Sequence, residues 1–93
     1  MELKYKIIYH PSVIKDDVPK IPEQYKKRIE KALNQKLATA PRFFGKQLHY
    51  SLRNHRKLKV GNYRIIFLIE ENIVNIICIG LRDKVYKNKR LYE

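Results

Sequence analysis

The second half of the chain carries three runs that we predict as strands, separated by two short turn signals, and this pattern constrains the fold more than any other feature. The runs cover 53–60, 63–70 and 73–81, with Gly61-Asn62 and Glu71-Asn72 between them. Two-residue loops of this kind join antiparallel neighbours. The last run is nearly all apolar, as expected of a strand in the middle of a sheet. The pattern therefore predicts a three-stranded antiparallel meander.

The first half of the chain supplies one strand and two helices. Residues 2–10 alternate between apolar and polar side chains, which indicates an amphipathic strand. A short helix is expected at 11–18, and a longer one from Pro22 to Pro41, where apolar residues recur at four-residue steps. The order predicts an α+β domain over residues 1–93, with both helices packed on one sheet face and a short C-terminal helix or tail.

Residues 42–51 read as a connection between the long helix and the meander. It contains two adjacent aromatic residues, Phe43 and Phe44, and then Gly45. We expect these aromatic rings to close the edge of the core rather than to stack on nucleic-acid bases.

Positive charge is concentrated in the second half of the chain. The formal net charge is +12, and residues 42–69 carry seven Lys or Arg and no Asp or Glu. A strongly basic face attracts polyanions, of which RNA and DNA are the usual ones. An acidic protein is a further possible partner.

The hairpin around Gly61-Asn62 gathers this charge on one face. Strand residues alternate faces, so His55, Lys57 and Lys59 share one face. If the loop has only two residues, Lys59 lies directly opposite Arg64. Like charges in that position are destabilising. The arrangement therefore suggests an anion that binds between them.

Several kinds of chemistry lack the residues that they need. His10, His49 and His55 are far apart and lack ligand partners at metal-binding intervals, and Cys78 is the single cysteine. There is no phosphate-binding glycine loop. We expect neither a metal nor a cofactor. No signal peptide or membrane span is visible, which favours the cytoplasm.

Cationic chemistry on a phosphate remains possible. RNA carries its own nucleophile, the 2′-OH. Lysines, arginines and a histidine can move its proton and stabilise the charge on phosphorus without a metal.

Two motifs resemble those of a known superfamily. The run Lys57-Leu58-Lys59-Val60-Gly61-Asn62-Tyr63-Arg64 is similar to Arg/Lys-Leu-Arg-Val-Gly-Asp-Tyr-Arg, and Ile79-Gly80-Leu81-Arg82-Asp83-Lys84-Val85-Tyr86 is similar to Ile-Gly-His-Arg-x-x-Val-Tyr. Both patterns belong to the RelE/ParE superfamily of bacterial toxins from type II toxin–antitoxin systems. The resemblance covers nearly the whole chain.

The RelE-like branch of this superfamily implies a ribosome-dependent mRNA endoribonuclease that cuts in the A site and inhibits translation. By this resemblance Arg64 stabilises the phosphorane, Arg82 lies at the scissile phosphate and assists the leaving group, and Tyr86 stacks on a base. Lys57 and Lys59 match basic positions that accept a proton or stabilise charge. His55 is a further candidate acid or base.

The expected partners are an acidic antitoxin, the ribosome and mRNA. Five further cations are expected to contact RNA: Lys46, Arg53, Arg56, Lys84 and Lys87.

The chain departs from the family pattern in three ways, one of which, Asn62 in place of the common Asp, concerns only the turn. Leu81 replaces the frequent histidine before Arg82, and no glutamate follows the region of Gly45, so the carboxylate base of one branch is missing. These departures favour a site built on Lys and Arg.

Other readings of the same residues stay open. Tyr86 can anchor the tail, Arg82 can pair with Asp83, and Lys57 and Lys59 can form a solvated strand face. A ParE-like inhibitor of DNA gyrase and a member that binds RNA or antitoxin without catalysis are the alternative functions.

Sheet register decides whether the two motifs meet. A two-residue turn at Glu71-Asn72 places Arg82 on the face opposite Arg64. A three-residue turn, or a twist at Gly80, is needed to bring the two arginines to one face.

Overall fold

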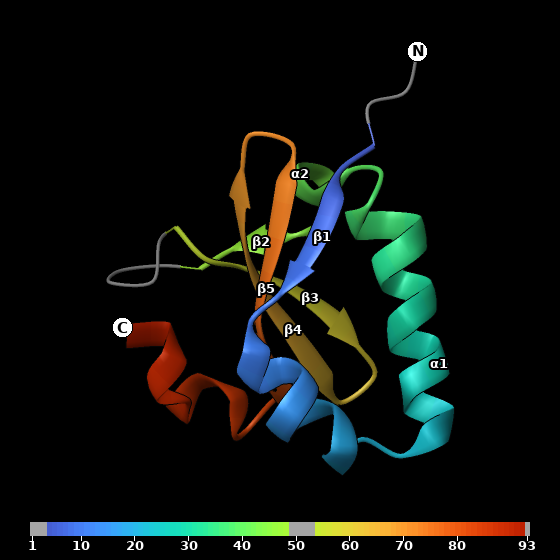
Figure 1. Ribbon diagram of the computed structural model, residues 1–93, viewed down its shortest axis with the longest axis vertical. Helices are drawn as coiled ribbons and strands as arrows, with labels where there is room; N and C mark the ends of the chain where they lie inside the picture. Colours follow the sequence, from blue (N-terminus) through green and yellow to red (C-terminus); the bar gives the residue numbers. More distant parts are fainter. Residues whose placement is uncertain (1–3, 49–53, 93) are drawn as a thin grey trace.

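The computed structural model describes residues 4–48 and 54–92, and its centre is one five-stranded mixed sheet in the order β1-β5-β4-β3-β2 (Figure 1). Strand β1 is parallel to β5, and the other neighbouring pairs are antiparallel. The strands are β1 Lys6–Tyr9, β2 Lys46–Gln47, β3 Arg56–Val60, β4 Tyr63–Glu70 and β5 Ile73–Leu81. The predicted meander is confirmed, and β5 is an interior strand between β1 and β4, as its apolar composition indicates.

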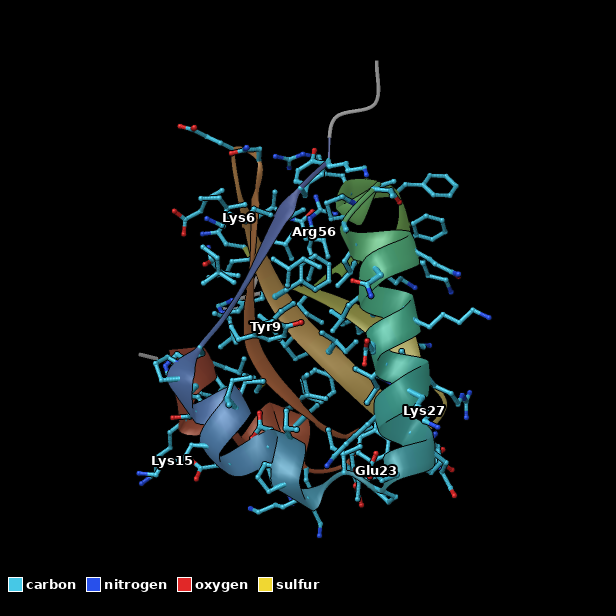
Figure 2. All side chains as sticks on the ribbon, turned by 45° about the vertical axis from the view of Figure 1, so that its right-hand side comes forward. Lys6, Tyr9, Lys15, Glu23, Lys27 and Arg56 are labelled. Carbon is cyan, nitrogen blue, oxygen red and sulfur yellow. The ribbon has the colours of Figure 1, made fainter. Side chains whose placement is uncertain are left out.

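Helical segments cover both faces of the sheet. They are η1 Val13–Asp17, η2 Val18–Lys20, α1 Glu23–Ala32, η3 Leu33–Leu37, α2 Pro41–Phe44, η5 Val85–Lys87 and η6 Lys89–Tyr92. We call η5 and η6 the C-terminal segment. The predicted α+β class is confirmed, with both predicted helices on one face (Figure 1). Figure 2 shows α1 along the sheet, with Lys27 on its outer surface.

Two clusters of buried side chains define the two faces. The larger cluster lies on what we call the helix face, where Val13, Ile29 and Leu37 pack against Ile65 and Phe67. The smaller cluster lies on the opposite side, which we call the tail face, and joins Ile66 and Cys78 to Val85 and Leu91. Side chains on both faces of β4 are therefore buried, because the helices cover the helix face and the C-terminal segment covers the tail face.

A β-bulge in β5 sets the register that the sequence left open. The β4–β5 loop has two residues, since Glu70 pairs with Ile73. The pairing then shifts between Ile66 and Phe67, whose partners are Cys78 and Ile76. The extra residue, Ile77, reverses the alternation beyond it. Arg64 consequently pairs with Gly80. The bulge thus shifts the β4–β5 pairing by one residue, as a three-residue turn would have done.

The first predicted strand is shorter in the structure, and part of it, residues 1–3, lies outside the described residues. The strand predicted at 53–60 is β3, which begins at Arg56 rather than at residue 53. The predicted connection at 42–51 contains a helical turn, α2, and an edge strand, β2, which pairs with β3. Residues 49–53 of that connection lie outside the described residues.

The expectation that Phe43 and Phe44 close the core is wrong. Phe43 is 82% exposed and Phe44 is 39% exposed. Gly45 explains why the core needs no further ring here: a Cβ on Gly45 would clash with the Phe67 ring, so Phe67 already fills that space. The helical turn α2 therefore presents its two aromatic rings outward.

Candidate functional site

Four cations share the tail face of strands β2, β3 and β4. Lys46 lies opposite Lys57, and Lys59 lies opposite Arg64. Lys57 pairs with Ile66, which belongs to the tail-face cluster, so all four residues occupy that face. The predicted pairing of Lys59 with Arg64 is confirmed. The sheet thus presents a cationic surface beside the C-terminal segment.

Arg64 is the most firmly held of these cations. Its residue is only 8% exposed. Its Nη1 donates to the carbonyl oxygen of Gly61 at 3.0 Å and to that of Tyr63 at 2.9 Å. Both acceptors belong to the β3–β4 hairpin, so the turn itself orients the guanidinium. Both bonds use Nη1, and no residue in 4–48 or 54–92 accepts a hydrogen bond from Nε or Nη2, so this edge of the fork can serve other acceptors.

Tyr86 is brought next to Arg64 by the C-terminal segment. It is half-buried and packs against the tail-face cluster. Burial raises the pKa of the Tyr86 phenol, the charge of the nearby Arg64 guanidinium opposes this rise, and Cys78 adds to it. The carbonyl oxygen of Tyr86 accepts a hydrogen bond from the Tyr92 hydroxyl at 3.1 Å. Tyr86 therefore both anchors the tail and lies within electrostatic reach of Arg64.

Arg82 lies at the turn that also holds Arg64. Its backbone N–H donates to the carbonyl oxygen of Asn62 at 2.9 Å, and its side chain is exposed. It follows Gly80, the partner of Arg64, by two residues, and lies in the turn just after the end of β5 at Leu81. No ion pair with Asp83 is present for Arg82 in the described part of the chain.

The remaining predicted residues are scattered. His55 precedes β3, is half-buried, and its carbonyl oxygen accepts from the Leu48 N–H. Arg56 pairs with Phe67 and so lies on the helix face, where its Nη1 donates to the Gly45 carbonyl oxygen at 3.0 Å. Lys87 is exposed on η5. Arg53 lies outside the described residues.

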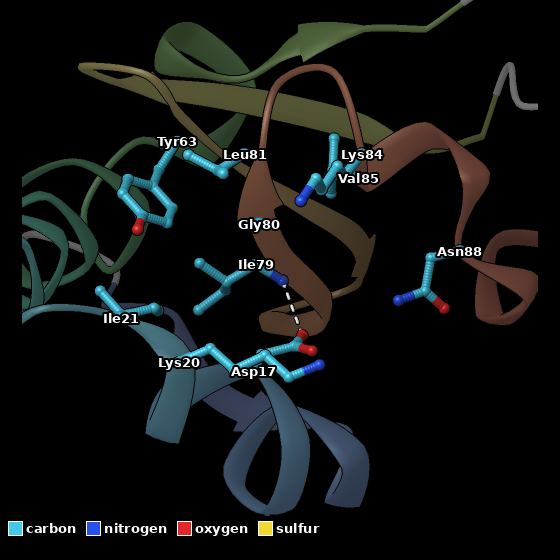
Figure 3. Close-up of a pocket in the computed structure, with 10 residues that line it drawn as sticks. All are labelled: Asp17, Lys20, Ile21, Tyr63, Ile79, Gly80, Leu81, Lys84, Val85 and Asn88. Carbon is cyan, nitrogen blue, oxygen red and sulfur yellow. Dashed lines mark hydrogen bonds between the residues drawn. The ribbon is translucent and has the colours of Figure 1, made fainter.

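A buried ion pair holds the C-terminal segment in place. Arg90 Nη2 donates to Asp17 Oδ1 at 2.7 Å and Arg90 Nη1 to Asp17 Oδ2 at 2.9 Å, with side-chain exposures of 11% and 10%. The same Oδ2 accepts from the Ile79 N–H at 2.9 Å (Figure 3), and Arg90 Nη1 also donates to the Ile77 carbonyl oxygen. This clasp joins η1, β5 and η6.

Sequence reasoning missed the clasp, because 73 residues separate its members and neither stands in a motif. Next to it, a pocket of about 180 Å³ lies between η2 and the end of β5 (Figure 3), and Lys84 lines it with Lys20 and Tyr63. Lys84 therefore lines a different surface from Lys57 and Lys59.

The chemistry available on the tail face is that of fixed positive charge. Across residues 4–48 and 54–92, no three His, Cys, Asp or Glu side chains lie close enough to hold a metal ion. Burial raises the pKa of the Cys78 thiol to about 12, Arg90 opposes the rise and Asp17 adds to it, so the thiol is not an activated nucleophile. Among residues 4–48 and 54–92, none of the helices has the length and apolar character that a membrane span requires.

Comparisons with known proteins agree on the family. The family model described as the ParE toxin of the type II toxin–antitoxin system parDE matches residues 4–86. No curated protein matches the sequence.

Solved structures share the fold at low identity. The RelBE2 toxin–antitoxin complex of Mycobacterium tuberculosis has a TM-score of 0.78 and 21% identity, over 86% of this chain and 93% of that one. A mutant of the Escherichia coli toxin RelE in the free state has a TM-score of 0.72 and 17% identity, over 96% and 90%. The RelB–RelE complex of Methanococcus jannaschii has a TM-score of 0.65 and 18% identity, over 85% and 94%. The chain therefore belongs to the ParE toxin family of the RelE/ParE superfamily and is a toxin of a type II toxin–antitoxin system.

Proposed function

We propose that the toxin is a ribosome-dependent, metal-independent endoribonuclease that cuts mRNA in the A site and so inhibits translation. One observation carries the proposal. Arg64 is buried and oriented by two hairpin carbonyls, on a face that also holds Lys57 and Lys59 and beside Tyr86. A buried, pre-oriented guanidinium stabilises a charge that develops in a transition state better than a mobile surface cation does.

The proposed reaction is attack of the RNA 2′-OH on the adjacent phosphorus. The new bond joins O2′ to phosphorus and the bond to O5′ breaks. O2′ gives up its proton and O5′ takes one from water, which leaves a 2′,3′-cyclic phosphate and a 5′-OH. Lys57 or Lys59 accepts the 2′-OH proton or stabilises charge, and Arg64 stabilises the phosphorane through its unused Nε–Nη2 edge. Arg82 lies at the scissile phosphate and assists the leaving group, while Tyr86 stacks on a base.

The proposed partner in the resting cell is an acidic antitoxin, whose carboxylates would occupy the cationic surface in place of RNA. Support comes from the net charge of +12 and from the solved structures, two of which are toxin–antitoxin complexes. The proposed site of action is the cytoplasm.

A second candidate is inhibition of DNA gyrase. The matching family model is that of ParE toxins, and this is the observation that favours it. That mode of action does not need the combination of Arg64, Arg82 and Tyr86 with two lysines, which is why we place it second.

Induction of the toxin without antitoxin distinguishes the two candidates. For the first, we expect translation to stop and cuts to appear within translated codons, as mapped by 5′-end sequencing of mRNA. Arg64→Ala should abolish growth arrest and cleavage while antitoxin binding persists, because only the oriented guanidinium is lost. Lys15→Ala removes the same charge from an exposed site on η1 and should stay toxic.

Two outcomes would contradict the proposal. Full toxicity of Arg64→Ala would remove the assigned role of that residue. DNA breaks and filamentation with intact mRNA would instead support gyrase as the target.

A further inference from the structure

A second cationic surface lies on the other side of the β3–β4 turn, between α1 and the end of β3. This basic groove has a volume of about 360 Å³. Its described lining contains four cations and no carboxylate, and its apolar side chains are only Ala32 and Val60. The cations are Arg28, Lys31, Lys36 and Lys59. None except Lys59 belongs to the proposed catalytic surface.

The charge on α1 is divided between its sides. The helix carries two carboxylates, and neither lines the basic groove. Glu23 forms an ion pair with Lys26 at 3.3 Å. Glu30 lines a different groove, beside Ile14 and Leu33. The side of α1 that faces β3 therefore keeps its positive charge without neutralisation by neighbouring carboxylates.

The hairpin turn connects the basic groove with the tail face. The Arg28 guanidinium lies against Gly61, since its Nη1 is 3.3 Å from the position that a Cβ on Gly61 would take. The Cζ atom of the same guanidinium lies 5.5 Å from the centre of the Tyr25 ring. The carbonyl oxygen of the same Gly61 accepts the hydrogen bond from Arg64. Lys59 lines the groove and also pairs with Arg64. One polyanion can therefore contact both surfaces around this edge of the sheet.

An aromatic pair lies at the other end of the groove. Lys36 Nζ lies 5.7 Å from the centre of the Phe44 ring. Phe44 packs edge-on against Phe43, with ring centres 5.0 Å apart, and Phe43 is 82% exposed. Exposed aromatic rings beside a cationic groove are typical of surfaces that bind single strands, because bases stack on the rings while cations bind the phosphates.

We propose that the basic groove and Phe43 form a second binding surface for single-stranded RNA. Lys31, Lys36 and Arg28 bind its phosphates, and Phe43 stacks on an unpaired base. The choice of RNA rests on the proposed function. An acidic protein helix is the less suitable occupant, because helix-in-groove binding needs large apolar pockets and this groove offers only Ala32 and Val60.

The test measures RNA affinity without cleavage. The probe is a fluorescein-labelled, unstructured 20-nucleotide RNA with 2′-O-methyl groups, which lack the nucleophile, and the readout is fluorescence anisotropy of the full-length toxin. The variant Lys31→Ala/Lys36→Ala should bind at least about tenfold more weakly, and the slope of log affinity against log salt should fall by about 0.7 for each lost phosphate contact. The matched control is Lys6→Ala/Lys15→Ala.

The control removes the same charge from exposed positions on β1 and η1, which Figure 2 shows on the side away from α1. It should keep the affinity within about twofold. A second variant tests stacking: Phe43→Ala should weaken binding by about 5- to 100-fold, while Phe43→Tyr keeps a ring and should bind normally. Circular dichroism verifies the fold of each variant.

Equal affinity and equal salt slope for the groove variant and its control would overturn the proposal. So would a groove variant that binds RNA normally but no longer binds the antitoxin, since the groove would then bind an acidic protein. The result is independent of catalysis. If Arg64→Ala stays toxic while the groove variant binds RNA more weakly, the catalytic role of Arg64 is contradicted but the proposed RNA-binding surface is supported.

Discussion

Two arginines, Arg28 of α1 and Arg64 of β4, contact Gly61 from different sides. The φ of Gly61 is +59°, in the left-handed region that favours glycine. One side of it touches the Arg28 guanidinium, and its carbonyl oxygen accepts from Arg64. The residue at this position must therefore adopt a left-handed turn conformation, leave space for the Arg28 guanidinium and accept a hydrogen bond from Arg64. Glycine satisfies the first two because it has no Cβ.

The variant Gly61→Ala should be less stable by about 1–2 kcal/mol, because a left-handed alanine is strained and its Cβ would press on Arg28. Urea denaturation followed by circular dichroism measures the change. The neighbouring Asn62→Ala is the control, since Asn62 is exposed and has no positive φ. It should change the free energy of unfolding by less than about 0.5 kcal/mol. Equal effects of the two would show that the turn is not strained.

At the scale of the element, the strands with clear alternation were the most predictable part of the molecule. The predicted spans 63–70 and 73–81 match β4 and β5. Alternation and a two-residue loop are local properties, so the sequence carries them. The bulge at Ile77 is different, because the extra residue is accommodated only when both strands are paired and both faces are covered.

The candidate site was predictable to the extent that it lies in strands. Lys57, Lys59 and Arg64 share a face because their spacing puts them there. The motif resemblance named Tyr86, but its position beside Arg64 depends on how the C-terminal segment folds back. Arg56, which was predicted to contact RNA, lies on the other face from these residues, because one step along a strand changes the face. The edge strand β2 was missed because two residues carry no periodicity.

The clasp between Asp17 and Arg90 is the element-scale contact on which the tail depends. Asp17→Asn should lower the free energy of unfolding by about 3 kcal/mol, because removing one partner of a buried ion pair leaves the other charge uncompensated. Asp16→Asn, at the exposed neighbouring position, should change it little.

The reactivity of the Cys78 thiol shows whether this loss of stability loosens the C-terminal segment. Cys78 is 1% exposed and packs in the tail-face cluster with Val85 and Leu91. A loosened tail should therefore let a disulfide reagent reach Cys78 faster in Asp17→Asn than in Asp16→Asn under native conditions. Equal rates for the two variants would mean that the clasp does not hold the tail.

At the scale of the whole molecule, the buried thiol makes stability depend on alkaline pH. Burial raises the pKa of Cys78 from 9.0 to about 12. Between these values the unfolded chain has lost the proton that the folded chain keeps, so stability falls as pH rises from about 9 to about 12. Burial also raises the pKa of Tyr9, with a contribution from Glu30, and that of Tyr86. Their effect has the same direction, beginning near pH 10.

The variant Cys78→Ala should show a shallower decline, by up to about 1.4 kcal/mol per pH unit. Urea titrations at pH 8, 9, 10 and 11 give the slopes, and the slope rather than the absolute stability is compared because alanine leaves a cavity. Identical slopes would show that the thiol titrates no differently in the folded chain.

The pairing of the first strand with the last one has a consequence for biosynthesis. Lys6 of β1 pairs with Ile73 of β5, and Asp17 forms its ion pair with Arg90. During translation the early segments therefore emerge long before their partners, and contacts between distant segments form late. The C-terminal segment, which carries Arg90, is made after all five strands. The clasp can therefore close, and Tyr86 can take its place beside Arg64, only after the strands of the sheet have been made.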